Sequence, residues 1–101
     1  MEHLRIATYE IKDGTFQDVA KVAEDGMLRT FRDQPGFIRY GLADLGDKTC
    51  LSVSLWETRT DADSSVPVAA TWVRENVSDR VELRSSRIGD LAFYEGIPAK
   101  V

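Results

Sequence analysis

The chain has 101 residues, of which 17 are acidic and 13 are basic, so its formal net charge at pH 7 is -4. The basic residues are scattered among acidic ones, which argues against nucleic acid or an anionic membrane surface as the main partner. A single cysteine excludes an internal disulfide framework and suits a reducing compartment.

The first predicted elements are a strand over residues 3–11 and a helix that starts at Thr15 and ends near Gln34. Asp18 follows Thr15 at the spacing of a capping box, so Thr15 is the expected N-cap. Apolar residues at three- and four-residue spacing then form one stripe along the helix, made of Phe16, Val19, Ala20, Ala23, Met27 and Phe31. Gly26 costs this helix about 1 kcal/mol relative to alanine, a cost that a close contact with another helix would explain.

The next segment predicts two adjoining antiparallel strands. Pro35 and Gly36 end the helix, and two extended runs follow on either side of a polar turn at residues 46–48: Phe37 to Leu45 and Thr49 to Trp56. One face of the second strand is fully apolar, with Leu51, Val53 and Leu55, and we expect a helix layer to cover it. The other face carries Cys50, Ser52, Ser54 and Trp56.

A second helix is predicted to begin near Thr60, with acidic residues in its first turn. Pro67 leaves two alternatives open, because it either kinks this helix or lies in the first turn of a helix that starts near Ser64 or Ser65. The stripe expected to face the sheet is Val66, Ala69, Ala70, Val73 and Val77. A last strand is predicted over residues 87–95, with Ile88, Leu91, Phe93 and Tyr94. The resulting order is βαββαβ, in a single domain spanning residues 1–101.

Few residues predict reaction chemistry. His3, the only histidine, lies at the start of a strand with Glu2 as its nearest acid in sequence, and we expect a solvated side chain. The sequence has no cluster of histidine, cysteine and acidic residues at metal-ligand spacing, so no metal site is expected. Cys50 lacks a neighbour in sequence that would activate its thiol, which indicates an inert residue.

The two tryptophans indicate a candidate cleft. Trp56 ends a strand, and Trp72 lies about 120° from the centre of its helix stripe at about 100° per residue. Asn76 is one turn further on the same flank, so an aromatic ring and an amide would line a seam between helix and sheet that suits a flat ligand. In the alternative reading, each tryptophan is packed at the margin of the core and Asn76 caps its own helix.

The order βαββαβ, a helix ending in QPGF, a strand ending in LWET and a helix carrying WVREN together resemble the antibiotic biosynthesis monooxygenase-like domain of the dimeric α/β barrel superfamily. This resemblance covers nearly the whole chain, from RIATYEIKDGT to the last strand. It implies an α+β, ferredoxin-like fold with a four-stranded antiparallel sheet and two helices on one face. It also implies a homodimer, a dimeric α/β barrel in which two sheets pair. We expect the partner to cover the face with Ser52, Ser54 and Trp56, which would otherwise lie open.

Two activities are known among the proteins that this chain resembles. Cofactor-independent monooxygenases oxidise polycyclic phenols with dioxygen, and the substrate anion supplies the electrons. They resemble this chain at Trp56, whereas their strand asparagine corresponds to Ser52 and their tyrosine to Ala62. Haem-degrading relatives also keep the tryptophan, but their first-strand asparagine falls near Ala7 and their haem-ligating histidine has no counterpart. Because iron loses its main anchor without that ligand, we do not expect haem degradation.

Two other proteins with this chain topology are poor matches. LSVSLWET lacks the glycines and the base-stacking aromatic pattern of an RNA recognition motif, and KDGT replaces the glycine-rich phosphate loop of acylphosphatase. MEHLRIATYE lacks the basic-then-apolar pattern of a signal, and no apolar run approaches the roughly 18 residues of a membrane helix. We therefore expect a cytoplasmic protein with neither nucleic acid nor a membrane as partner.

The predicted function is the binding of a small aromatic or hydrophobic molecule between helices and sheet, with or without cofactor-independent oxygenase activity. The alternative is a non-catalytic binding or accessory protein with the same fold. No cofactor is expected. The predicted catalytic residues are Ser52, Trp56 and Asn76, and the predicted substrate-binding residues are Tyr9, Tyr40, Trp56 and Trp72.

Overall fold

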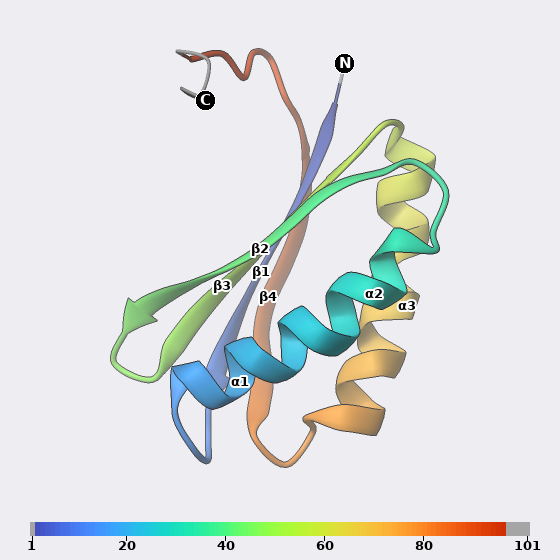
Figure 1. Cartoon of the computed structure of the whole chain (residues 1–101). Helices are drawn as coiled ribbons and strands as arrows, with labels where there is room; N and C mark the ends of the chain where they lie inside the picture. The colour runs from blue at the N-terminus through green and yellow to red at the C-terminus, as the bar shows by residue number, and fades with distance from the viewer. Residues whose placement is uncertain (1, 97–101) are drawn as a thin grey trace, which may run out of the picture.

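A computed structural model describes residues 2–96 and shows helices stacked on one face of an antiparallel sheet (Figure 1). The elements in chain order are β1 (His3–Ile11), α1 (Phe16–Val22), η1 (Ala23–Met27), α2 (Leu28–Arg32), β2 (Phe37–Gly46), β3 (Thr49–Trp56), α3 (Arg59–Asn76) and β4 (Val81–Asp90). The segments α1, η1 and α2 follow one another without a break and form the first helix layer. The predicted order βαββαβ is therefore confirmed.

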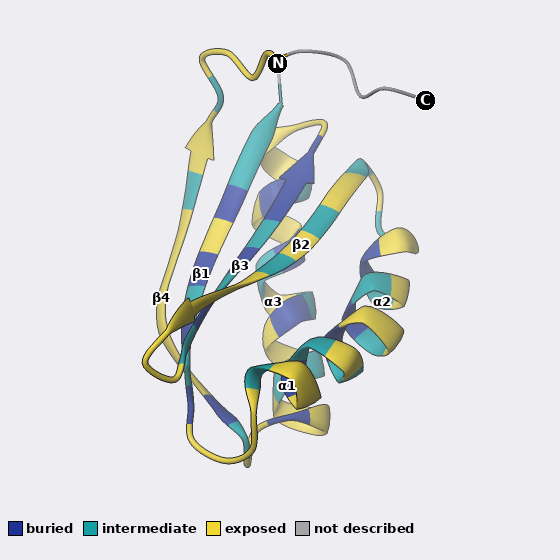
Figure 2. Ribbon diagram, turned by 60° about the vertical axis from the view of Figure 1, so that its left-hand side comes forward, coloured by how far each residue is buried: buried dark blue, intermediate teal, exposed yellow. Residues whose placement is uncertain are grey.

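The sheet has four strands in the order β2-β3-β1-β4, and every neighbouring pair is antiparallel. The central strands β1 and β3 carry most of the buried strand residues, whereas the edge strand β4 is mostly exposed (Figure 2). This is a ferredoxin-like α+β fold, as the sequence predicts.

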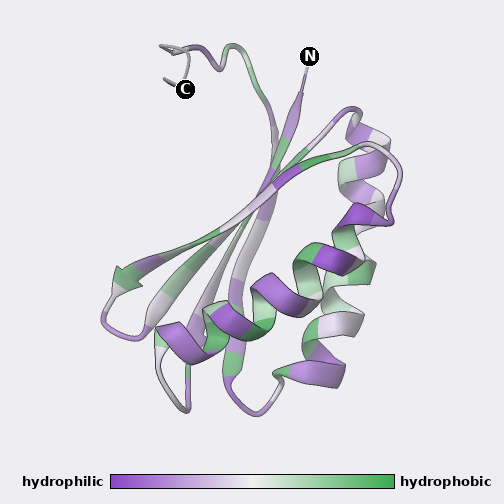
Figure 3. Ribbon diagram, in the orientation of Figure 1, coloured by the Kyte–Doolittle hydropathy of each residue, from purple (hydrophilic) through white to green (hydrophobic). Residues whose placement is uncertain are grey.

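The first helix begins and ends as its sequence predicts. The Thr15 hydroxyl accepts the Asp18 backbone N–H, and the Asp18 carboxylate accepts the Thr15 N–H, both at 3.2 Å. Gly36, at φ +74°, allows the turn into β2 where a Cβ would collide with the carboxylate of Asp61. Between these ends lies a feature that the sequence does not predict, the π-helical turn η1, which contains Gly26. Hydrophobic and hydrophilic residues alternate along this helix, as Figure 3 shows.

The second helix runs without interruption from Arg59 to Asn76, with the hydroxyl of Thr58 capping its start. Pro67 lies inside it, so the alternative of a helix that starts near Ser64 or Ser65 is wrong. Proline lacks an N–H, and the carbonyl that it leaves without a partner belongs to Asp63, an exposed residue that water can reach. The predicted stripe needs one correction, because Ala70 is exposed while Ala62 and the side chain of Ser65 are buried.

The last strand lies earlier in the chain than predicted. It spans Val81–Asp90, where residues 87–95 were expected, and Phe93 and Tyr94 follow it with 79% and 65% of their surface exposed. As an edge strand, β4 leaves most of its side chains in solvent, so its sequence is polar and lacks the apolar run that marks a buried strand. The apolar pattern of the sequence therefore marks the residues that follow β4 and not the strand itself.

The two faces of β3 are the reverse of the expectation. The helices cover the face with Cys50, Ser52, Ser54 and Trp56, all of which are buried. Leu51 and Val53 lie on the opposite face, which we call the outer face, together with Ile6 of β1. Alternation along a strand reports two faces without saying which one the helices cover. Here the helix-facing side of β3 is the more polar one, so the prediction that the helices cover the more hydrophobic side is wrong.

Within residues 2–96, no helix combines the length and the apolar character that crossing a membrane requires.

Candidate functional site

The inner face of the sheet, which the helices cover, is unusually polar for a core. Cross-strand pairing places its residues in rows that run from β2 through β3 and β1 to β4. One row is Tyr40, Ser54, Arg5 and Ile88, and the next is Leu42, Ser52, Ala7 and Ser86. A sheet that served only as a packing surface would carry aliphatic side chains here. These hydroxyls and the guanidinium form a polar floor under the helices.

A cavity of about 30 Å³ lies between this floor and the helices. Among the predicted site residues, it brings together Tyr9, Tyr40, Ser52 and Trp72. Its walls are apolar side chains from all the helical segments, including Val19, Met27, Phe31, Ala69 and Val73. A volume of this size holds about one water molecule, whereas sites for drug-sized ligands measure about 300–1,000 Å³. An aromatic ligand therefore enters this cavity only where it continues into a larger space.

Such a space lies beside the cavity. A groove of about 300 Å³ runs between α3 and β4, and it shares Arg5, Tyr9, Val73 and Val81 with the interior cavity. Its volume reaches the lower end of the range for ligand pockets. Interior cavity and groove together are the candidate binding site of the chain.

Tyr40 is the predicted site residue whose chemistry the fold changes most. Burial raises the pKa of its phenol well above the usual value, and the neighbouring Tyr9 adds to this rise. The Ser52 hydroxyl and Arg5 act in the opposite direction, with a smaller effect on the pKa. At neutral pH the phenol of Tyr40 is therefore protonated and donates a hydrogen bond within the cavity, so it does not serve as a general base.

Arg5 is the site residue that the sequence analysis missed. It is 3% exposed, and it lines both the interior cavity and the groove. The signal was present in the alternation of β1, since Arg5 shares a face with Ala7, Tyr9 and Ile11, which are all buried. An arginine in that series is a buried cation, which a survey of motifs does not detect.

Trp56 and Asn76 do not join this cavity. Trp56 is fully buried, donates its indole N–H to the Ser54 hydroxyl at 2.8 Å, and packs edge-on against Phe31 and Phe37. The exposed Asn76 donates its amide N–H to the carbonyl of Trp72 at 2.8 Å. The first residue thus belongs to an aromatic core and the second binds its own helix. Their catalytic roles stay predictions that these positions do not favour.

The remaining reactive side chains have structural surroundings. Burial, followed by the charge of Asp44, raises the pKa of the Cys50 thiol, which makes a thiolate nucleophile harder to form. His3 is less solvated than expected, because its ring nitrogen Nδ1 lies 2.7 Å from Asp90 on the adjacent strand. Within residues 2–96, no three histidine, cysteine or acidic side chains gather to hold a metal ion.

The class that this architecture defines is the ferredoxin-like fold of antibiotic biosynthesis monooxygenase-like proteins. A variant of SnoaB from Streptomyces nogalater, described as a cofactor-independent oxygenase, has a TM-score of 0.72 at 10% identity, with 92% of this chain and 95% of that chain covered. HapK from Hahella chejuensis has a TM-score of 0.68 at 18% identity, with 99% and 100% covered. A candidate antibiotic biosynthesis monooxygenase from Nitrosomonas europaea has a TM-score of 0.63 at 19% identity, with 94% of each chain covered. These likenesses concern the fold. No family model matches the chain, and no curated protein matches it significantly in sequence.

Proposed function

We propose that this protein binds a small aromatic molecule between its helices and the inner face of its sheet. The observation that carries the proposal is that the interior cavity lies beside a groove of about 300 Å³, and that both are lined by Arg5, Tyr9, Val73 and Val81. The apolar walls would hold an aromatic ring, and the hydroxyls of the floor would orient its polar substituents. Trp72 lines the interior cavity, so a ligand there would change its fluorescence.

A cofactor-independent oxygenase is the second candidate, favoured by the likeness in fold to SnoaB. In such a reaction an anthrone-type phenol is oxidised to a quinone by one dioxygen molecule, one oxygen atom entering the product and the other leaving as water. The substrate anion supplies the electrons. Tyr40 and Ser52 would donate hydrogen bonds to the substrate oxygen in an apolar surrounding, where such bonds are stronger than in water.

The experiment measures oxygen consumption and tryptophan fluorescence with a panel of acidic polyphenols, anthrones and hydroquinones, without added cofactor. Turnover above the rate of autoxidation in buffer, reduced at least tenfold by Ser52→Ala or Tyr40→Phe, would establish an oxygenase. Thr71→Ala, on the exposed side of α3, is the matched control and should leave turnover unchanged. Saturable quenching without turnover would establish a binding protein. The absence of both signals over the whole panel would contradict the proposal.

We also propose a cytoplasmic homodimer that pairs through the outer face of the sheet. Ile6 is 38% exposed on that face, beside the half-buried Val53 and Leu51. A second copy would cover these apolar side chains. The interface is therefore proposed on the face opposite to the one that the sequence favoured.

A further inference from the structure

Arg5 lies on the inner face of the sheet, where an arginine with a purely structural role would be paired with an acidic side chain. It lies near the middle of the inner face, between Ser54 of β3 and Ile88 of β4, on the central strand β1. Only 3% of its surface is exposed. Its guanidinium nitrogens that lack a hydrogen bond still reach solvent, because no buried side-chain nitrogen or oxygen within residues 2–96 is without a partner.

No carboxylate neutralises this cation within the described residues. The ion pairs formed by residues 2–96 leave Arg5 out, although the chain has an excess of acidic residues. Its Nε donates a hydrogen bond of 3.3 Å to the Ser86 hydroxyl. A guanidinium has five N–H donors and stays protonated, so most of its binding capacity is unused. Since Arg5 also lines the groove, a ligand there can reach the donors that the protein leaves free.

The groove leads to this guanidinium from outside. Its walls include Val66, Ala70, Val73 and Leu83, which suit an aromatic ring. The residues that line it include a second arginine, Arg74, and no acidic side chain. A planar guanidinium pairs with a carboxylate through two parallel N–H···O bonds, a geometry that a neutral amide cannot match. Walls and charge together fit a molecule with a ring and an anionic oxygen group.

We propose that Arg5 is the receptor for an anionic oxygen group, a carboxylate or an acidic phenolate, on the aromatic ligand. This inference rests on the proposed function, since it adds the charge of the ligand to its aromatic character. The ring lies in the groove between α3 and β4, and the anionic oxygens meet the guanidinium at the inner end of the groove. Since the whole chain carries a net charge of -4, preference for an anion requires a local cation, and Arg5 lies where the groove meets the interior cavity.

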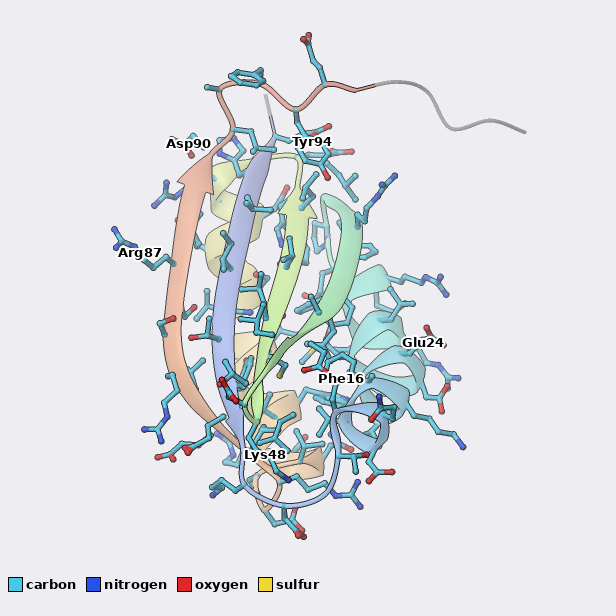
Figure 4. All side chains as sticks on the ribbon, turned by 90° about the vertical axis from the view of Figure 1, so that its left-hand side faces the viewer. Phe16, Glu24, Lys48, Arg87, Asp90 and Tyr94 are labelled. Carbon is cyan, nitrogen blue, oxygen red and sulfur yellow. The ribbon has the colours of Figure 1, made fainter. Side chains whose placement is uncertain are left out.

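Isothermal titration calorimetry with a matched pair of probes tests the inference. 2-Naphthoate carries the charge, and 2-naphthamide is its neutral isostere; 2,4-dinitro-1-naphtholate replaces the carboxylate by a phenolate. The purified protein should bind 2-naphthoate at least tenfold more tightly than 2-naphthamide. Arg5→Met should bring the two affinities within twofold of each other, and Arg5→Lys should recover part of the difference. Arg87→Met removes the same charge from the outer side of β4 and should keep the wild-type ratio. Figure 4, which looks onto the outer face, shows Arg87 extending beyond the β4 edge.

The outcomes separate the two proposals. Equal affinity of the wild-type protein for the charged and neutral naphthalenes would overturn the role of Arg5 and leave aromatic binding intact. Binding of none of the probes would contradict both. If only the naphtholate, or only the naphthoate, binds more tightly than 2-naphthamide, the group that Arg5 receives is thereby identified. Circular dichroism of Arg5→Met and Arg5→Lys verifies the fold. If Arg5→Met is unfolded, the affinity ratios in Arg5→Lys and Arg87→Met decide: an unchanged ratio in Arg5→Lys, or a lost ratio in Arg87→Met, overturns the inference.

Discussion

The indole of Trp72 lies directly against Gly26, so that a Cβ built on this glycine would come 2.6 Å from Cζ2 and 2.9 Å from Nε1 of the ring. The contact joins the π-helical turn η1 to α3 and brings the two helices together over the interior cavity. It also explains why a residue that disfavours helices stands within one.

Gly26→Ala should destabilise the protein, although alanine favours a helix by about 1 kcal/mol. The added methyl overlaps a ring held by the core, and such overpacking costs about 1–3 kcal/mol. Urea unfolding measures the net change. Gly41→Ala is the control, since a Cβ at that position meets nothing within 4 Å. The loss at Gly26 should shrink in a Trp72→Leu background, and equal losses in both backgrounds would mean that the indole is not the cause.

Tyr40 should make stability fall at alkaline pH. Its folded-state pKa lies above the unfolded value of about 10, so the folded protein retains a proton that the unfolded chain releases. The contribution is complete below pH 10 and is lost as the pH rises toward the folded-state pKa, at about 1.4 kcal/mol for each pH unit. Urea unfolding at pH 8 and pH 11 measures the loss. Tyr40→Phe should reduce it, whereas Tyr94→Phe, an exposed tyrosine, should not. An identical loss in Tyr40→Phe and the wild type would refute this role of burial.

Val53→Lys should convert the proposed dimer to a folded monomer. Val53 pairs with Ile6 on one side and Gly41 on the other, which places it near the middle of the outer face. A lysine there would bring a charge into an apolar interface, whereas in the monomer it would be solvated. Light scattering at micromolar concentration gives the mass, with Thr71→Lys on the exposed side of α3 as the control. A monomeric wild type would contradict the proposed assembly.

Asn76→Ala should affect stability and spare ligand binding. Its amide bonds to the carbonyl of Trp72 near the end of α3, and such a hydrogen bond contributes about 1 kcal/mol. The side chain is exposed and outside the cavity, so the affinity for 2-naphthoate should change less than twofold. Calorimetry compares the two proteins. A tenfold loss of affinity or of turnover, with the fold retained, would restore Asn76 to the site that the sequence predicted.

The sequence predicted the positions of helices and strands better than it predicted which face of the sheet the helices cover. The bounds of β1, the hairpin and the first helix follow from local signals such as the Thr15 capping box and Pro35-Gly36, because these depend on neighbouring residues. The start of the second helix stayed open, since Pro67 fitted two alternatives. Which side of β3 the helices cover depends on the whole assembly. The face of β3 with Ser52 and Ser54 is less hydrophobic than the opposite face, and it is nevertheless the one that the helices bury.

The candidate site could be predicted only in part for the same reason. Tyr9, Tyr40, Ser52 and Trp72 were named from strand ends, helix flanks and resemblance, and the fold brings them together. Arg5 carries no motif, since its importance comes from burial without a partner. Both properties arise only when β1, β4 and α3 are assembled.

The π-helical turn η1 also constrains the number of residues that the first helix can contain. It holds one residue more than an α-helical turn, and each residue rotates a helix by about 100°. Val19, before the turn, and Phe31, after it, both pack into the core, so the number of residues between them sets which way each one points. In a regular α-helix their separation would place Phe31 about 120° away from Val19, and the extra residue of the wide turn removes this offset. Deletion of the exposed Asp25 should therefore convert the turn to a regular α-helix and keep both residues directed at the core. The helix should thus tolerate the loss of one residue at this turn better than a further insertion, which would rotate Val19 and Phe31 apart.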